Sequence, residues 1–220
     1  KNPGPYPEKQ NKNGVTDWVF VTNISTKGWI LDAICREIGS RQPSSWYVAY
    51  EPSKLPPANN YFFSHQSIYQ NYVREKQDDL NTGSFFTYYT HPNITMTDQQ
   101  KEEMVDSLNN ATQVVFMCSQ HRDNLIKEGF NPERGRVVVG GADPDLFTWH
   151  ERGSGGIGIS SAYYERKNPD LLLALIKALP HRKFLLSGQN WEEYKNFPEM
   201  LEQPNFEYHT IPYAEYPKFY

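Results

Sequence analysis

The sequence predicts an α/β protein built as two units with parallel sheets. Strand-like apolar runs alternate with helical patterns from Thr16 to the end of the 220-residue chain. Strands separated by helices imply crossover connections between parallel strands. A Gly- and Ser-rich stretch at Gly153–Gly156 interrupts this alternation, which then restarts. We therefore expect one domain over residues 15–150 and the first part of a second over residues 151–220.

The expected strands are short runs rich in aromatic and β-branched residues, a composition that favours strands. In the first domain they are Trp18–Val21, Trp46–Tyr50, Tyr61–Phe63, Phe85–Thr90, Val114–Met117 and Gly135–Gly140. In the second they are Ile157–Ser160, Lys183–Ser187 and Phe206–Ile211.

The expected helices of the first domain lie between capping and stop signals. Trp29–Ile38 and Gln66–Val73 are the first two. Thr97 forms a capping box with the glutamine three residues later and opens a third helix. Ser119 is expected to cap a short fourth helix, which a glycine ends.

In the second domain, Asn168 and Pro169 are typical of the N-cap and first position of a helix that continues over Leu171–Leu179. A helical turn at Trp191–Tyr194 and a helix beginning at Ala214–Tyr220 follow.

Composition excludes some classes of function. The formal net charge of -4 and the pI of about 5.9 argue against a nucleic-acid binder. No apolar run approaches the ~20 residues that cross a bilayer. Cys35 and Cys118 lie in apolar contexts that suit buried free thiols, so we expect a reducing compartment, the cytoplasm.

Lys167 lies in a strand-to-helix turn, directly before the Asn168-Pro169 helix start. Backbone N–H groups and the helix dipole converge at such a turn, which makes it a natural seat for a phosphate. Arg166 beside it is a second candidate phosphate ligand. The alternative is that one or both of these side chains are merely solvated.

The segment Val137–Phe147 resembles the Asn-Gly-Val-Asp-x-x-x-Phe hinge of retaining glycosyltransferases with two Rossmann-like domains, the GT-B architecture, most like their group 1 (family 4). Gly140-Gly141-Ala142-Asp143 takes the place of Asn-Gly-Val-Asp. The strand, turn and helix around Lys167-Asn168-Pro169, and then Leu185–Gly188, resemble that family's donor-binding domain.

This resemblance implies two Rossmann-like domains facing across a cleft. It also implies transfer of a sugar from a nucleotide-sugar to a carbohydrate or other acceptor, with retention of configuration, as in polysaccharide biosynthesis. No metal or cofactor besides the donor is implied, and peripheral membrane contact is compatible with it. The family's paired glutamates, which hold the ribose and the donor sugar, would lie beyond Tyr220, so we expect the second domain to be truncated.

The resemblance also assigns roles to residues. Arg166, Lys167 and Gly188 would bind the donor diphosphate, and His91 would act near the donor sugar. Independently of the resemblance, Gly28 lies in the first strand-to-helix loop, where a glycine could let an acceptor or a donor phosphate approach. Each has a plainer interpretation, such as an ordinary turn glycine for Gly188.

Other residues and functions stay open. His65 follows a strand as His91 does but has no counterpart that we can place, and Asp143 is interpreted as a hinge residue. The family's usual Arg before the Lys is replaced by Ser160-Ser161-Ala162. Two other functions remain: a non-catalytic nucleotide- or sugar-binding module, and a different two-domain α/β enzyme such as a nucleotide-sugar epimerase.

Overall fold

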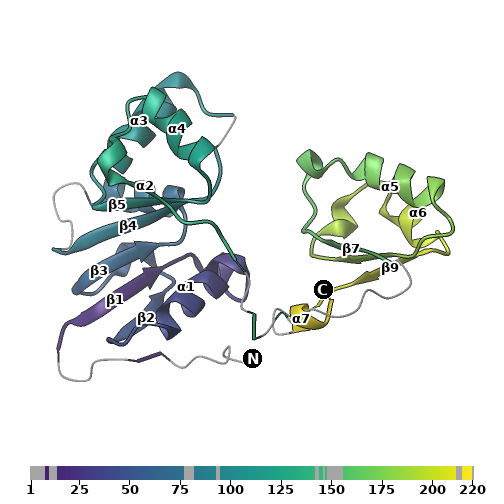
Figure 1. Ribbon diagram of the computed structural model, residues 1–220, viewed down its shortest axis with the longest axis horizontal. Coiled ribbons are helices and arrows are strands. Elements are labelled where there is room, and N and C mark those ends of the chain that lie inside the picture. The colour runs from purple at the N-terminus through teal and green to yellow at the C-terminus, as the bar shows by residue number, and fades with distance from the viewer. Residues whose placement is uncertain are drawn as a thin grey trace. The chain divides into compact units, whose positions relative to one another are not determined.

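The computed structural model describes residues 8–9, 14–76, 82–92, 95–141, 144–145, 147, 156–211 and 215–219. The chain divides into two compact units, Lys1–Gly141 and Ala142–Tyr220. Each contains its own parallel sheet, as the alternation of strands and helices predicts (Figure 1). The expected boundary between residues 150 and 151, and the hinge residue Asp143, lie outside the described residues.

The first unit holds a sheet of six strands in the order β2-β1-β3-β4-β5-β6, and every pair of neighbours is parallel. The strands are β1 (Thr16–Val21), β2 (Trp46–Ala49), β3 (Ala58–Phe63), β4 (Ser84–Tyr89), β5 (Gln113–Phe116) and β6 (Gly135–Val137). The last is shorter than the expected Gly135–Gly140, because only three of its residues pair with β5.

The strand order reverses at β1. The chain goes from β1 to one side to form β2, then returns past β1 to form β3 and continues outward to β6. In open parallel sheets, ligands bind outside the carboxyl ends of the strands at such a switch point, where neighbouring loops diverge. The loops after β1 and β3 therefore flank the position at which this topology favours a ligand.

In the described part of this unit, four α-helices cover the two faces of the sheet. The first, α1, packs its Cys35 against Phe20 and Trp46 on one face. The other three pack against the opposite face, around Phe63 and Phe116 (Figure 1). Their bounds are α1 (Ile30–Ser40), α2 (Gln66–Glu75), α3 (Asp98–Asn109) and α4 (Ser119–Lys127). The 3₁₀ turns are η1 (Ile24–Thr26), η2 (Pro52–Lys54) and η3 (Pro132–Arg134).

The capping signals of these helices were predicted with mixed success. The box of Thr97 and Gln100 is present, with both side chains accepting the expected backbone N–H groups. The assignment of Ser119 as a cap is wrong, because the backbone is still extended at Cys118 and Ser119 is already the first residue of α4. Cys35 is buried as expected, whereas Cys118 is partly exposed.

The second unit holds a three-stranded parallel sheet in the order β7-β8-β9. Asn168 caps α5 and Pro169 is its first residue, as predicted. The strands are β7 (Ile157–Ser160), β8 (Phe184–Ser187) and β9 (Phe206–His209). The helices are α5 (Pro169–Ala178), α6 (Phe197–Leu201) and α7 (Tyr216–Phe219), with the turns η4 (Glu165–Lys167) and η5 (Trp191–Glu193).

A separate apolar core holds the second unit together. Leu173 and Ile176 of α5 pack with Leu186 of β8, Trp191 and Met200. Helix α6 contributes Met200 to this core, although the sequence analysis missed that helix. A proline in its first turn is a helix-start signal that would have found it.

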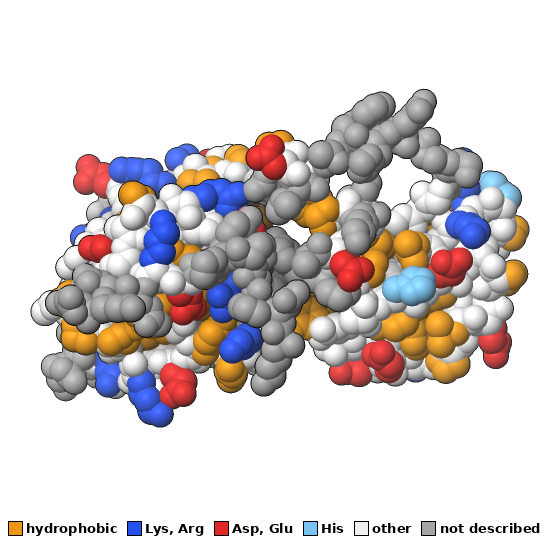
Figure 2. All heavy atoms as spheres, turned by 90° about the horizontal axis from the view of Figure 1, so that it is seen from below, with side chains coloured by type: hydrophobic (Ala, Val, Ile, Leu, Met, Phe, Trp, Pro, Cys, Tyr) orange, Lys and Arg blue, Asp and Glu red, His pale blue; other side chains and the backbone are white. Residues whose placement is uncertain are grey.

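On the face drawn in Figure 2, basic and acidic side chains are interspersed with apolar ones. This mixed surface agrees with the small net charge of -4. Among the described residues, no helix is both long enough and apolar enough to cross a bilayer.

Asn205 ties the end of α5 to the start of β9. Its side-chain Nδ2 lies 3.0–3.1 Å from the carbonyl oxygens of Ile176, Leu179 and Arg182, which share its two N–H donors. We expect Asn205→Ala to lower the free energy of unfolding by about 2 kcal/mol, since three carbonyl groups, one of them in a buried contact, lose their donor. Urea unfolding measures this loss, and Asn71→Ala, at an exposed helix position, is the control. Equal stability of the two variants would contradict the role of Asn205.

Candidate functional site

The carboxyl edge of the six-stranded sheet carries a cluster of polar side chains. The adjacent strands β1, β3 and β4 end there, and Thr22, Ser64 and Thr90 are the first residues after them. Thr22 and Ser64 are fully buried. Buried hydroxyl groups are costly unless they are hydrogen-bonded, so their partners define how this edge is built.

A chain of hydroxyl groups joins the loops after β1 and β3. Ser64 Oγ donates to Thr22 Oγ1 at 3.0 Å, and Thr22 Oγ1 lies 2.6 Å from Thr26 Oγ1. Thr26 Oγ1 in turn donates to the carbonyl of Asn23 at 2.7 Å. Each hydroxyl can therefore donate once, in a single direction. The two loops at the switch point are held together by side chains as well as by the sheet.

Gln66 joins the loops after β3 and β4. Its Oε1 accepts the backbone N–H of Thr90 at 3.2 Å, and its Nε2 donates to the carbonyl of His91 at 3.0 Å. The side chain is only 4% exposed. The His91 ring lies outside this clamp on an exposed residue, with Nδ1 2.9 Å from Thr90 Oγ1. His91 thus follows the carboxyl end of β4, as predicted, on a backbone that Gln66 holds.

His65 lies beside His91, with ring centroids 5.8 Å apart and ring planes at 67°. It is the N-cap of α2, and its Nδ1 accepts the backbone N–H of Ser67 at 3.1 Å. Partial burial, followed by the proximity of His91, lowers the pKa of His65 to about 4. The ring is therefore neutral at physiological pH, with its proton on Nε2, because Nδ1 is an acceptor.

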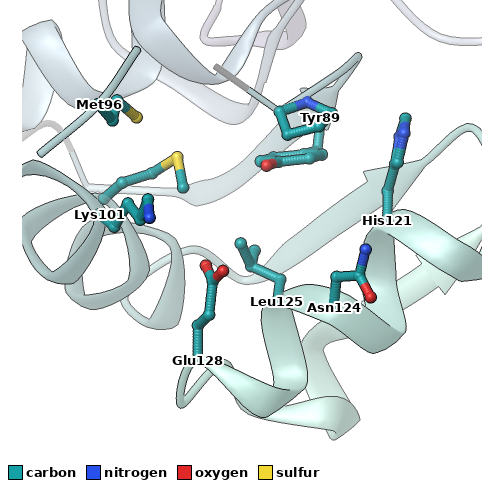
Figure 3. A pocket seen from close by; sticks show the side chains of 9 residues that line it. Tyr89, Met96, Lys101, His121, Asn124, Leu125 and Glu128 are labelled. Atoms are coloured by element: carbon teal, nitrogen blue, oxygen red, sulfur yellow. The ribbon is translucent and has the colours of Figure 1, made fainter. Parts of the chain in front are cut away.

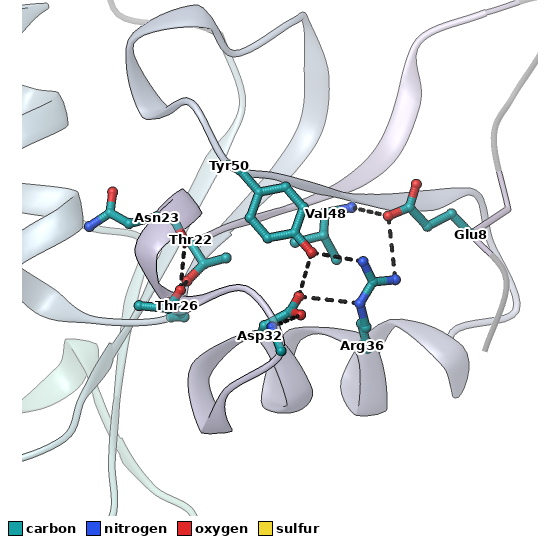
Figure 4. A network of polar contacts seen from close by, with 10 residues as sticks. Glu8, Thr22, Asn23, Thr26, Asp32, Arg36, Val48 and Tyr50 are labelled. Atoms are coloured by element: carbon teal, nitrogen blue, oxygen red, sulfur yellow. Dashed lines mark hydrogen bonds and ion pairs between the residues drawn. The ribbon is translucent and has the colours of Figure 1, made fainter. Parts of the chain in front are cut away.

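Gly28 lies in the loop between β1 and α1, at a backbone φ of +82° that favours glycine. Its N–H donates to the buried carboxylate of Asp32 at 2.8 Å. Tyr50 and Arg36 hold the other oxygen of Asp32, and Glu8 pairs with Arg36 (Figure 4). The proposed phosphate loop therefore has its Gly28 N–H already occupied by a carboxylate.

The same network affects Tyr50. Burial, together with the hydrogen bond from its hydroxyl to Asp32, raises the pKa of Tyr50 to about 12. Arg36 Nη2 donates to the same hydroxyl at 2.7 Å, and the ammonium of Lys27 lies 4.8 Å from the centre of the Tyr50 ring. This network fixes the shape of the loop after β1.

A pocket of about 100 Å³ lies beyond β4, between α3 and α4 (Figure 3). Tyr89, Met104 and Leu125 form its apolar part, and Lys101 and Glu128 bring opposite charges to it. It is smaller than the roughly 150 Å³ of an engineered cavity that binds benzene, so it suits a small substituent rather than a whole sugar ring.

In the second unit, Arg166 and Lys167 are exposed residues of η4, immediately before the N-cap of α5. The Arg166 guanidinium lies over the Tyr164 ring, 5.0 Å from its centre. The loop that carries them packs on the next loop, since Tyr163 N–H donates to the carbonyl of Gln189 at 2.9 Å. The two cations thus lie at the start of α5, as the sequence predicts, in a turn that a hydrogen bond connects to the next loop.

Gly188 has a structural reason to be glycine. It is buried, and a Cβ atom there would lie 1.8 Å from the carbonyl oxygen of Ser161. Trp191 Nε1 donates to that same oxygen at 2.7 Å, which fixes its position. The close approach that requires glycine is therefore made by the chain itself, and a contact of Gly188 with a diphosphate stays a prediction.

The structure gathers some of the predicted residues and adds others. His91 and Gly28 lie at the carboxyl edge of the first sheet, while Arg166, Lys167 and Gly188 belong to the second unit. Sequence reasoning missed Gln66 and gave His65 little weight, although both histidines occur two residues after a strand. Within the described ranges, no three His, Cys, Asp or Glu side chains are grouped as metal ligands.

No protein-family model matches the sequence, and no curated protein matches it. Solved structures do match the fold. The chain is similar to Anabaena Alr3699/HepE, seen in complex with UDP and glucose and in complex with UDP-glucose, each at a TM-score of 0.59. The identity is 11%, over 92% of this chain and 71% of that chain. A further HepE structure, in complex with UDP, matches at a TM-score of 0.53 and 10% identity. This likeness shows that the two proteins share a fold.

The lowered pKa of His65 makes a prediction about pH. The unfolded chain, with a histidine pKa near 6.5, binds a proton that the folded ring resists until about pH 4. Above pH 6.5 the ring is neutral in both states, so its titration does not lower the free energy of unfolding. As the pH falls from 6.5 toward 4, the unfolded chain takes up the proton first, and the free energy of unfolding decreases. We expect urea unfolding to show a steeper loss of stability over this range for the wild type than for His65→Asn. Asparagine keeps an N-cap acceptor but does not titrate. Parallel curves would contradict this prediction.

Gly188→Ala tests the packing role of that glycine. The added methyl group would push Ser161 away from Trp191 Nε1, and we expect a loss of about 2 kcal/mol in unfolding free energy. Gly140→Ala is the matched control, since a Cβ atom there meets nothing within 4 Å. Thermal or urea unfolding of the two variants measures the difference. A Gly188→Ala protein as stable as the control would show that the Ser161 contact relaxes freely.

Proposed function

We propose that this protein is a retaining glycosyltransferase of the GT-B type, which moves a sugar from a nucleotide-sugar to an acceptor. One observation carries the proposal: 92% of the chain shares its fold with a protein whose crystal structures hold UDP and glucose or UDP-glucose. The first donor to test is therefore a UDP-hexose. A carbohydrate acceptor, peripheral membrane contact and a cytoplasmic location are predictions of the same proposal.

The second unit is proposed to bind the donor diphosphate. Departure of a nucleoside diphosphate leaves negative charge on its oxygen atoms, and prearranged cations that face this charge lower the barrier to transfer. Arg166 and Lys167 supply two exposed cations directly before the positive end of the α5 dipole. Both side chains are exposed, so a diphosphate can reach them.

The first unit is proposed to contact the transferred sugar. His91 follows β4 at the carboxyl edge, on a backbone to which the Gln66 side chain is hydrogen-bonded. An imidazole there can hydrogen-bond a sugar hydroxyl or stabilise the sugar as positive charge develops at its anomeric carbon. We therefore expect His91 to affect the turnover rate more than the affinity for the donor.

The assay for this proposal follows both donor and product. The full-length protein is given UDP-glucose with a panel of carbohydrate acceptors, and the release of UDP and the anomeric configuration of the product are measured by NMR. We expect a product with the donor's configuration. Inversion would contradict the retaining mechanism. UDP-glucose binding without turnover, or its conversion to an epimer, would assign the site to the binding module or to the epimerase instead.

Lys167→Ala tests the diphosphate site. Loss of a charge-assisted hydrogen bond should weaken UDP binding by about 1.5–3 kcal/mol, or roughly 10- to 150-fold. Isothermal titration of the full-length protein with UDP measures this change. Lys195→Ala, at another exposed lysine of the second unit, is the control and should leave the affinity unchanged. Equal affinities in the two variants would mean that Lys167 is only a solvated side chain.

A further inference from the structure

His65 occupies the topological switch point of the first sheet. It follows β3, whose neighbour β1 is the strand at which the order reverses. The residue before it, Ser64, donates to Thr22 after β1, and the residue after it, Gln66, clamps the backbone after β4. His65 therefore lies between the two cross-strand connections of this edge. His91, in contrast, follows β4, one strand farther from the switch point.

The cap of α2 determines which nitrogen atom of His65 can act. Nδ1 accepts the Ser67 backbone N–H and lies 2.7 Å from the Ser67 hydroxyl, so it is committed to the helix start. A proton on Nδ1 would point at the Ser67 backbone N–H, and two donors cannot form a hydrogen bond with each other. The neutral ring therefore carries its proton on Nε2. Within the part of the chain that the structure describes, Nε2 has no hydrogen-bond partner.

The ring is also held in place from two sides. Its N-cap bond fixes it to α2, and the His91 ring packs edge-on against it at 5.8 Å. The two rings stand on adjacent parallel strands, each two residues beyond the strand end, and Gln66 connects their backbones. An oriented N–H that does not change its charge at physiological pH is suited to a neutral ligand oxygen.

We infer that His65 is a sugar-binding residue whose Nε2–H donates to a hydroxyl oxygen of the donor sugar, beyond the carboxyl ends of β1 and β3. This inference rests on the proposed function and deepens it. It assigns to His65 the recognition of a hydroxyl group of the sugar. The required ligand chemistry is a neutral hydroxyl oxygen, which UDP-glucose offers in its hexose and UDP alone lacks there.

The experiment compares UDP-glucose and UDP binding to the full-length wild type and to His65→Asn. Asparagine keeps an acceptor for Ser67 N–H, so α2 keeps its cap, but its shorter side chain places no donor at the position of Nε2. We expect the affinity for UDP-glucose to fall about fivefold, the effect of one neutral hydrogen bond, and the affinity for UDP to stay unchanged. His181→Asn, at an exposed histidine, is the matched control.

A second measurement does not depend on any variant. Long-range ¹H–¹⁵N NMR of the wild-type imidazoles should show His65 neutral at pH 7, protonated at Nε2, with the Nε2 resonance shifting on addition of UDP-glucose but not of UDP.

The outcomes separate the two proposals. A His65→Asn protein that binds UDP-glucose as tightly as the wild type, or a His65 ring protonated at Nδ1, overturns the inference and leaves the glycosyltransferase proposal standing. A wild-type protein that binds neither UDP nor UDP-glucose overturns both.

Discussion

The parallel pairing of β1 with both β2 and β3 is the constraint on which the candidate site depends. The next two strands in the chain, β2 and β3, lie on opposite sides of β1 in the sheet. The loops after β1 and β3 therefore leave the sheet on diverging paths. Their polar residues then meet at one edge although more than 40 positions separate Thr22 from Ser64 in the chain. Without this strand order, the hydroxyl chain and the two histidines would have no common location.

Side-chain hydrogen bonds convert that topology into a defined surface. Gln66 and the hydroxyls of Thr22 and Ser64 are buried, and an unpaired buried polar group costs about 1–3 kcal/mol. Each of them is paired across a strand boundary, so a shift of one loop would break bonds in the next. The free-energy cost of breaking these hydrogen bonds keeps His65 and His91 next to each other. Asp32 does the same for the loop after β1, through the N–H of Gly28.

Local signals predicted much of the fold, because they depend on neighbouring residues. The cap at Asn168, the box at Thr97 and the parallel strands could all be predicted from short segments. The roles of His65 and Gln66 could not, since they depend on which strands are adjacent. Gly188 illustrates the same limit: its sequence context fits a ligand contact, but the Ser161 carbonyl that requires a glycine lies on another strand's loop.

The central claim is that this protein binds a nucleotide-sugar such as UDP-glucose. Backbone ¹H–¹⁵N NMR of the isotope-labelled full-length protein, titrated with UDP-glucose, tests it most directly. We predict saturable shifts in two groups of amides, one at Ser64–Gln66 and His91 and the other at Tyr164–Asn168. UDP alone should shift chiefly the second group. Shifts confined to residues outside both groups would contradict the proposed site, and no shifts at saturating UDP-glucose would contradict the claim.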